Sequence, residues 1–311
     1  MNRRTHLKIL GTLGLLSPIQ QLACSPKEEM ESGYNIHLFS KHLQWLDYEN
    51  MSKVAKEIGF DGLDLTVRRK GHVLPENVER DLPKAVAAMR KAGLQAEMIT
   101  TNINNIQEPS TEKILKTASQ LGIKSYRMGW LKYKDGQSIP EQIEAFQPQL
   151  KELEQMNEHY KIRGDYQNHA GTSVGSAVWD IWMLIKELNP EWIGCQYDIR
   201  HAMVEGLNSW EIGLKLLQRH IKTLDLKDFI YLQKDHKWTV KNVPIGEGAV
   251  DFQGYFTLLK ELNITAPISI HAEYDLGGAE HGATTLKIPA ETVIARLKKD
   301  LTQLKRTIHK K

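Results

Sequence analysis

Short apolar runs typical of buried β-strands alternate along most of the chain with longer amphipathic runs typical of helices. Successive strand-like runs begin about 27 to about 45 residues apart, which matches one strand, one helix and two connections. Eight such runs predict a single-domain α/β fold, the (β/α)8 TIM barrel, which typically takes about 250 residues. The predicted strands are Asn35–Ser40, Gly62–Thr66, Ala96–Thr101, Ser125–Trp130, Arg163–Asn168, Trp192–Asp198, Thr223–Lys227 and Ile268–Glu273.

The segments between these runs have the periodicity of helices with one apolar face. Between Glu49 and Ile58, apolar side chains recur at positions 51, 54, 55 and 58, and Gly59 follows as a stop signal. Apolar residues make up 41% of the 311 residues and charged residues 25%, so the chain has enough apolar surface for a large core. This composition excludes a chain that is disordered throughout.

The first 24 residues resemble an export signal. Arg3 and Arg4 precede an apolar stretch that is too short to span a bilayer, as in twin-arginine signals, and a lipobox-like sequence ends at Cys24. We therefore expect a signal at 1–24, a linker at 25–33 and the barrel at 34–311. The expected location is the periplasm, or the membrane surface through a lipid on Cys24; the alternative is an uncleaved amphipathic leader.

The charge and the cysteine content exclude further classes of protein. Arg3, Arg4 and Lys8 account for the formal net charge of +3, so the rest of the chain is close to neutral. A neutral domain lacks the broad basic face that nonspecific nucleic-acid binding requires, and we expect no nucleic-acid partner. Only Cys24 and Cys195 are present, and with Cys24 at the signal boundary no intramolecular disulfide is expected.

Polar residues gather where the last four predicted strands end, which is where TIM barrels carry their chemistry. Asp198, Asp225 and Glu273 follow three consecutive strands, and Gln167 ends the strand before them. Carboxylates ~4 Å apart repel by about 4 kcal/mol at an effective dielectric constant of 20, so either some are protonated or a cation neutralises them. These four residues are the predicted ligands of a divalent metal. Oxygen ligands favour Mn²⁺ or Mg²⁺, and nearby histidines leave Co²⁺ or Zn²⁺ open.

Each of these residues also has a structural alternative. A strand-end aspartate often caps the following helix, and a buried histidine often only packs in the core. Lysine and arginine at strand ends often serve only in ion pairs. The coincidence of three acids at three consecutive strand ends is what favours the metal site.

Several of these residues match a known family. The chain from about 34 to about 301 resembles the xylose-isomerase-like TIM-barrel superfamily, the sugar phosphate isomerase/epimerase group. The matching features are the YQNH run at 166–169, Asp198 with His201 three residues later, the LKD run at 226–228, the PIGEGAVDF turn at 244–252, and Glu273.

The resemblance implies one divalent metal held by Glu, Asp, His and Glu at the ends of the fifth to eighth strands. Asp198 and Glu273 match the second and fourth ligands, whereas Gln167 and Asp225 replace the first Glu and the His. Family isomerases and epimerases use the two glutamates as paired acid and base, and glutamine cannot carry a proton. One-base chemistry therefore fits better than epimerisation through opposite faces.

The sequence thus predicts an exported, metal-dependent sugar isomerase/epimerase-type enzyme that removes a proton next to a sugar carbonyl. The predicted base is Glu273, with His201, His169 and Lys227 as further catalytic residues. The predicted substrate contacts are Arg200, His271, Glu280 and His281. One alternative is a 3-keto-glycoside lyase that acts by β-elimination, and another is a noncatalytic sugar-binding lipoprotein. In all three hypotheses the protein binds a small carbohydrate.

Overall fold

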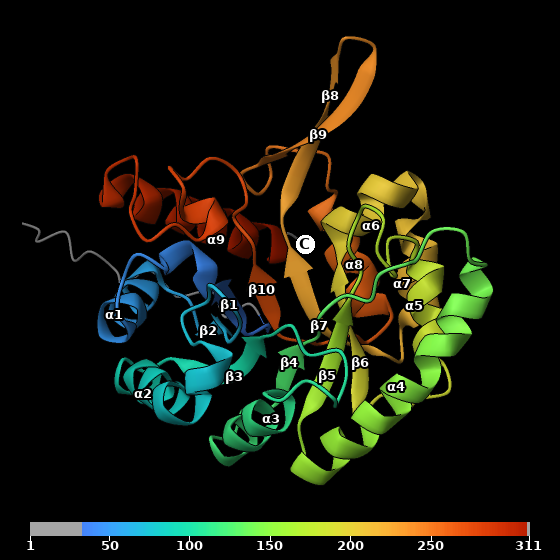
Figure 1. Cartoon of the computed structure of the whole chain (residues 1–311). Helices are drawn as coiled ribbons and strands as arrows, with labels where there is room; N and C mark the ends of the chain where they lie inside the picture. The colour runs from blue at the N-terminus through green and yellow to red at the C-terminus, as the bar shows by residue number, and fades with distance from the viewer. Residues whose placement is uncertain (1–32, 310–311) are drawn as a thin grey trace, which may run out of the picture. The chain divides into compact units, whose positions relative to one another are not determined.

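Eight parallel strands close into a barrel within residues 33–309, the part of the chain that the computed structural model describes. Neighbouring strands along the barrel also follow one another in sequence, and the last one closes onto the first (Figure 1). This arrangement confirms the predicted (β/α)8 barrel. The barrel strands are β1 (Ile36–Phe39), β2 (Gly62–Thr66), β3 (Gln95–Thr100), β4 (Ser125–Arg127), β5 (Arg163–Gln167), β6 (Ile193–Asp198), β7 (Ile221–Leu226) and β10 (Ile268–Ile270).

Helices cover the outside of the barrel: α1 to α5 pack in sequence order, α5 and α6 both contact α7, and α8 contacts α9, which returns to α1. The α-helices are α1 (Tyr48–Ile58), α2 (Val78–Lys91), α3 (Thr111–Gln120), α4 (Ile139–Tyr160), α5 (Val178–Ile185), α6 (Ile199–Gly206), α7 (Trp210–Leu217), α8 (Phe252–Glu261) and α9 (Ala290–Ile308). Short 3₁₀ turns are η1 (Ser40–Leu43), η2 (Pro75–Asn77), η3 (Leu207–Ser209) and η4 (Ala279–His281). No helix within residues 33–309 combines the length and the apolar character that crossing a membrane requires.

The boundaries of α1 follow from its sequence. The Asp47 carboxylate accepts a hydrogen bond of 2.8 Å from the Asn50 backbone N–H, which satisfies one of the free donors of the first turn. Gly59 ends the helix with a φ of 106°, a conformation that suits glycine. Met51 and Ile58 are buried as the periodicity predicts. The capping residues and the apolar face therefore indicate the same helix.

The interior of the barrel is polar at positions that most TIM barrels fill with branched apolar side chains. Along β7, Thr223 and Asp225 are buried, and they alternate with Leu224 and Leu226, which are buried as well. In the middle of β5, Asp165 accepts a hydrogen bond from Thr223 Oγ1 at 3.1 Å. The barrel therefore encloses a network of hydrogen bonds and charges.

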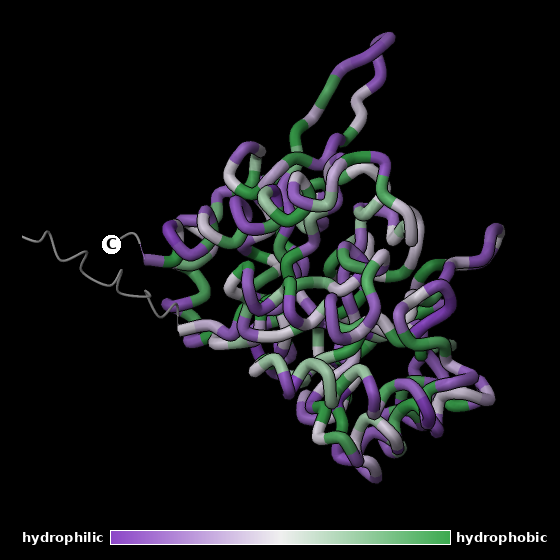
Figure 2. Tube along the Cα trace, turned by 90° about the vertical axis from the view of Figure 1, so that its left-hand side faces the viewer, coloured by the Kyte–Doolittle hydropathy of each residue, from purple (hydrophilic) through white to green (hydrophobic). Residues whose placement is uncertain are grey.

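An antiparallel hairpin follows β7 and was not predicted from the sequence. It consists of β8 (Asp228–Lys234) and β9 (Lys237–Val243), and it projects away from the barrel strands (Figure 1). Figure 2 shows hydrophilic residues at its tip. The two turn residues, Asp235 and His236, have φ values of 49° and 60°, as a type I′ turn requires. The usual Asn-Gly or Asp-Gly signal for that turn is missing from the sequence.

The predicted export signal at 1–24, with Cys24, lies outside the described residues, and so does all of the predicted linker except Gly33. Both therefore stay predictions.

Candidate functional site

The C-terminal ends of the eight barrel strands form the barrel mouth, and buried charged side chains converge beneath it. Strand pairing places Asp198 of β6 directly beside Asp225 of β7, and Gln167 of β5 beside Gln196 of β6. Among the carboxylates assigned to the site from the sequence, Asp198 and Asp225 have no solvent exposure. The Glu273 side chain is 25% exposed. Glu273 is therefore the carboxylate of this set that a substrate can reach.

Asp198 caps a helix and forms an ion pair at the same time. Its Oδ1 accepts a hydrogen bond of 3.0 Å from the backbone N–H of His201, in the first turn of α6. Its Oδ2 lies 3.0 Å from Lys227 Nζ. Burial alone would lower the pKa of Lys227, but Asp198 and Glu273 raise it above its ordinary value, which keeps the ammonium charged.

Two lysines hold Glu273. Lys41 Nζ, from η1, lies 2.8 Å from Glu273 Oε1, and Lys227 Nζ lies 3.4 Å from Oε2. Burial raises the pKa of Glu273, but the charges of Lys227 and Lys41 outweigh this effect and hold the pKa well below its usual range. Glu273 is consequently an ionised carboxylate at neutral pH.

Gln167 presents its amide N–H groups to the carboxylates. Its Oε1 accepts a hydrogen bond of 3.2 Å from Arg127 Nη1, and its Nε2 donates to Asp198 Oδ2 at 3.0 Å and to Asp225 Oδ2. The guanidinium has only donors, so the amide oxygen must face Arg127 and the nitrogen must face the acids. The Gln167 amide oxygen, which was predicted to bind a metal, therefore already accepts a hydrogen bond from Arg127.

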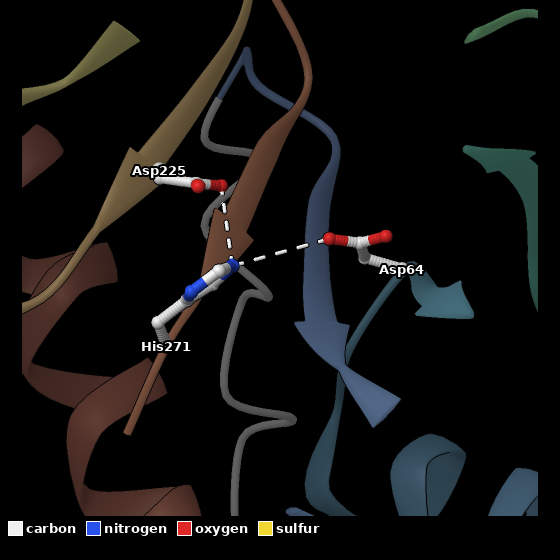
Figure 3. Close-up of side chains that lie close together, drawn as sticks. All are labelled: Asp64, Asp225 and His271. Carbon is white, nitrogen blue, oxygen red and sulfur yellow. Dashed lines mark ion pairs between the residues drawn. The ribbon is translucent and has the colours of Figure 1, made fainter. Parts of the chain in front are cut away.

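Asp64, Asp225 and His271 lie together deeper in the barrel (Figure 3). His271 Nε2 is 3.3 Å from Asp225 Oδ1 and 3.9 Å from Asp64 Oδ2, and it has no hydrogen-bond partner among the described residues. One ligand atom from each residue lies within 4.8 Å of the other two. The distances of 3.3 and 3.9 Å are those of neighbouring ligands around a cation bound at about 2.0–2.2 Å from each. Asp64, on β2, was not among the residues predicted from the sequence.

The two carboxylates of this group differ from Asp198 and Glu273 in their partners. No lysine or arginine nitrogen of residues 33–309 lies within 4 Å of Asp64 or Asp225. Asp64 instead accepts from the hydroxyls of Thr100 and Ser269, both at 2.9 Å, and Asp225 accepts from Gln196 Nε2 at 2.7 Å. Burial raises the pKa of Asp64, and it raises that of Asp225 to about 7. These are the carboxylates that a cation would stabilise most.

His169 and His201 at the mouth are neutral, and their rings are in contact at an interplanar angle of 37°. The ring centres of His169 and His201 lie 3.9 Å apart, and Trp130 covers His169 at 4.6 Å. Arg200 Nη1 lies 2.9 Å from His201 Nδ1, which must accept because the guanidinium only donates. The proton of His201 therefore sits on Nε2, which has no hydrogen-bond partner within residues 33–309. Burial lowers the pKa of both rings.

The remaining residues predicted to contact substrate have structural partners. Arg200 Nη2 donates to Asn242 Oδ1 at 2.8 Å, which connects α6 to the hairpin. Glu280 Oε2 accepts from the backbone N–H groups of Leu276 and Gly278 and closes its own loop. His281 is 84% exposed and lies 3.6 Å from Glu280. Glu280 and His281 are thus joined to their own loop.

The LKD run and the GEG turn form one structural unit around Asp228. The Asp228 carboxylate accepts hydrogen bonds from the backbone N–H groups of Phe229, Gly246, Gly248 and Val250 at 2.8 to 3.1 Å. A Cβ on Gly248 would lie 2.2 Å from Asp228 Oδ1, so the turn needs glycine there. These residues hold the hairpin base and position Lys227, the neighbour of Asp228.

Sequence reasoning missed Lys41, Asp64 and Arg127. Asp64 carried a readable signal, since it is an acid inside an otherwise apolar strand with the spacing of an inward-facing position. Lys41 carried no such signal because it lies on a short 3₁₀ turn after β1.

Comparison of the chain with models of known protein families identifies its family. A family model described as xylose isomerase-like TIM barrel matches residues 52–294. The chain belongs to this family. The family resemblance that the sequence predicted is therefore confirmed.

Solved structures share the fold at low sequence identity. L-ribulose 3-epimerase aligns with a TM-score of 0.67 and 11% identity over 88% of this chain and 94% of its own. A 3-keto-D-glucoside 4-epimerase from E. coli aligns with a TM-score of 0.60 and 14% identity over 86% of this chain and 99% of its own. The zinc-bound IolI protein aligns with a TM-score of 0.69 and 15% identity over 89% and 99%. A search of curated proteins found no match.

Proposed function

We propose that the protein is a carbohydrate enzyme of the isomerase/epimerase type, in which Glu273 removes a proton next to a sugar carbonyl. The observation that carries this proposal is the state of Glu273, which is ionised by two lysines and yet 25% exposed beneath the mouth. An ionised carboxylate that is open to the mouth can accept a proton from a bound substrate, and its low pKa makes it a weak base that relies on stabilisation of the oxyanion formed. The solved structures titled as epimerases of L-ribulose and of 3-keto-D-glucoside support a keto-sugar substrate.

The neighbours of Glu273 can stabilise the charge that proton removal creates. Lys227 and Lys41 keep positive charge beside the base, where an oxyanion would form on the neighbouring carbonyl oxygen. His201 keeps its buried Nε2–H 3.6 Å from Asp198 Oδ2 and without a hydrogen-bond acceptor in residues 33–309. His169 Nδ1 lies 2.9 Å from the Ala170 carbonyl, to which it must donate, so its Nε2 is left to accept a substrate hydroxyl. These side chains hold and orient a sugar while Glu273 takes the proton.

A divalent metal fits Asp64, Asp225 and His271 better than the four residues predicted from the sequence. The centre of the predicted set, Gln167, Asp198, Asp225 and Glu273, is filled by N–H donors from Gln167 and Lys227. Within residues 33–309, the deeper three residues offer two carboxylates that no lysine or arginine pairs with and an imidazole nitrogen that forms no hydrogen bond. When bound there, an ion would supply positive charge beneath the mouth. The zinc atom in the IolI structure supports a metal in this fold.

A lyase is the second candidate function. Removal of a proton next to the ketone of a 3-keto-glycoside would form a carbon–carbon double bond as the aglycone departs with its electron pair. The aglycone then needs a proton, and the donors present are the Lys41 and Lys227 ammonium groups beside Glu273 and His201 Nε2–H beside Asp198. The 3-keto-D-glucoside named in one structural neighbour supports this substrate class. A noncatalytic sugar-binding protein is the third candidate.

Deuterium exchange tests the proposal. We expect the protein to exchange the proton next to the carbonyl of ketohexoses or 3-keto-glucosides in D₂O, as followed by NMR. Glu273→Gln should abolish exchange, whereas Glu211→Gln, on the exposed surface of α7, should leave it unchanged. Release of free aglycone with an unsaturated keto-sugar identifies the lyase. Sugar binding without exchange identifies the noncatalytic protein and contradicts the proposal.

We also propose that the protein is exported, on the basis of Arg3, Arg4 and Cys24. Cell fractionation of the full chain should place it in the periplasm or at the membrane. Loss of membrane attachment in Cys24→Ala would support lipidation, and a cytoplasmic location of the full chain would contradict export.

A further inference from the structure

Three cationic side chains gather around one aromatic ring at the mouth. Lys41 Nζ, Arg68 Cζ and Arg127 Cζ lie 5.2, 5.4 and 5.9 Å from the centre of the Phe39 ring. His271 stacks on the same ring at 4.2 Å. Because Lys41 is bound to Glu273, this cationic cluster adjoins the proposed catalytic base.

Two members of the cationic cluster form no ion pair in the described part of the chain. Lys41 is paired with Glu273 at 2.8 Å, whereas no carboxylate oxygen of residues 33–309 lies within 4 Å of Arg68 or Arg127. Arg127 is 5% exposed, and its single hydrogen bond runs to Gln167, while Nε and Nη2 find no acceptor. The carboxylates of Asp225, Asp64, Glu273 and Asp198 act on this charge from beyond ion-pair distance and offset part of the cost of its burial, whereas the donors Nε and Nη2 stay without an acceptor.

The two guanidinium groups also act on each other. Burial and the charge of Arg127 together lower the pKa of Arg68 to about 10, against the opposing charges of Asp64 and Glu273. The Arg68 side chain has no hydrogen-bond or ion-pair partner in the described part of the chain. An anion beside Arg68 would relieve the repulsion between the two guanidinium groups.

Arg68 also borders a cavity of about 610 Å³ between the loops that follow β2 and β3. This volume lies in the range of small-molecule sites. Its lining is mixed: the basic side chains of Arg69 and Lys113 lie beside Arg68, and Glu76 and Glu108 are the acidic residues. Arg68 therefore borders both this cavity and the cationic cluster, because it also lies on the Phe39 ring that Lys41, the partner of Glu273, contacts.

We infer that the substrate is a sugar acid whose carboxylate is bound by Arg68 in the field of the buried Arg127. The inference rests on the proposed function, because it assigns the substrate class of the same mouth. Planar guanidinium groups match a carboxylate in two-point hydrogen bonding. A sugar phosphate offers the same kind of oxyanion, so the experiment includes it as a separate arm.

Calorimetric titration tests this inference without turnover. The probes are D-glucuronate, D-galacturonate and D-mannuronate, each beside its parent hexose, with glucose 6-phosphate as the phosphate arm. We expect at least one uronate to bind about tenfold more tightly than its hexose, which corresponds to about 1.4 kcal/mol. Arg68→Gln should remove this preference, and Arg127→Met should weaken it. Arg80→Gln, on the exposed surface of α2, should keep it.

Each other outcome overturns the inference. Equal binding of uronate and hexose, no uronate binding, or a preference that survives Arg68→Gln all contradict the carboxylate site. Tighter binding of glucose 6-phosphate than of every uronate contradicts the sugar-acid assignment. If Arg127→Met does not fold, the result for Arg68→Gln decides the test. Glu273→Gln should bind the uronate and lack deuterium exchange, so failure of catalysis is distinguishable from failure of this subsite.

Discussion

Lys227 Nζ lies 3.0 Å from Asp198 Oδ2 inside the barrel, and both side chains are almost fully buried. The same ammonium reaches Glu273 Oε2 at 3.4 Å. One lysine thus neutralises a structural carboxylate and the proposed base together. This pairing leaves Asp64 and Asp225 as the neighbouring acids without a cationic partner among the described residues.

Removing the ammonium should destabilise the fold strongly. Lys227→Met leaves Asp198 buried and unpaired, and breaking a buried ion pair in this way costs about 3–5 kcal/mol. Urea unfolding followed by circular dichroism measures the loss. Lys215→Met, which breaks an exposed pair with Glu211, should change the free energy of unfolding by less than about 0.5 kcal/mol. A loss in Lys227→Met as small as in this control would contradict the role of Lys227.

The proposed metal position predicts a pattern of metal content. The protein purified without chelator should carry about one equivalent of divalent metal by elemental analysis, and His271→Ala and Asp64→Asn should lose it. Asp198→Asn should retain it, because Asp198 is occupied by Lys227 and by the cap of α6. Loss of metal in Asp198→Asn with retention in His271→Ala would favour the set predicted from the sequence instead.

Gln167→Glu probes the amide at the centre of the mouth. The change removes the N–H groups that face Asp198 and Asp225 and adds a third negative charge. We expect the metal-free variant to lose about 1–3 kcal/mol of stability, and Mn²⁺ or Zn²⁺ to raise its melting temperature more than that of the wild type. Gln253→Glu, on the surface of α8, serves as the control. If the ion raises the melting temperature of Gln167→Glu and of the wild type equally, this result would count against a cation near Gln167.

Asp300 gives a pH dependence that is independent of the mouth. It is fully buried on α9, where it accepts from Tyr274 Oη at 2.8 Å and from the Ile245 N–H at 3.1 Å. Burial raises its pKa to about 7. The folded state therefore binds this proton more tightly than the unfolded state, whose carboxyl titrates near 3.8. The stability that Asp300 contributes is present at low pH and is lost as pH rises from about 4 through about 7.

The comparison of Asp300→Asn with the wild type isolates this contribution. The wild-type profile should include a fall of up to about 1.4 kcal/mol per pH unit from this group, and the variant profile should lack it. Urea unfolding at several pH values between 4 and 7.5 supplies both curves. Parallel curves for the two proteins would show that Asp300 does not titrate in this range.

The sequence by itself determined the eight-stranded barrel and the strand ends at which Gln167, Asp198, Asp225 and Glu273 lie. Strand length, helix periodicity and glycine stops are local properties, so they are readable from neighbouring residues. The hairpin was missed because Asp235 and His236 adopt positive φ without the glycine that usually marks such a turn.

Only the tertiary structure decided which charges meet. Lys41, Asp64 and Arg127 come from three different β/α units, and their distances to Glu273, His271 and Gln167 depend on barrel closure and strand register. The same closure placed Lys227 between Asp198 and Glu273, where the sequence had suggested a metal. Ion pairing acts over a few ångströms in space, whereas a sequence pattern records only separation along the chain, and that is why the partners could not be derived from it.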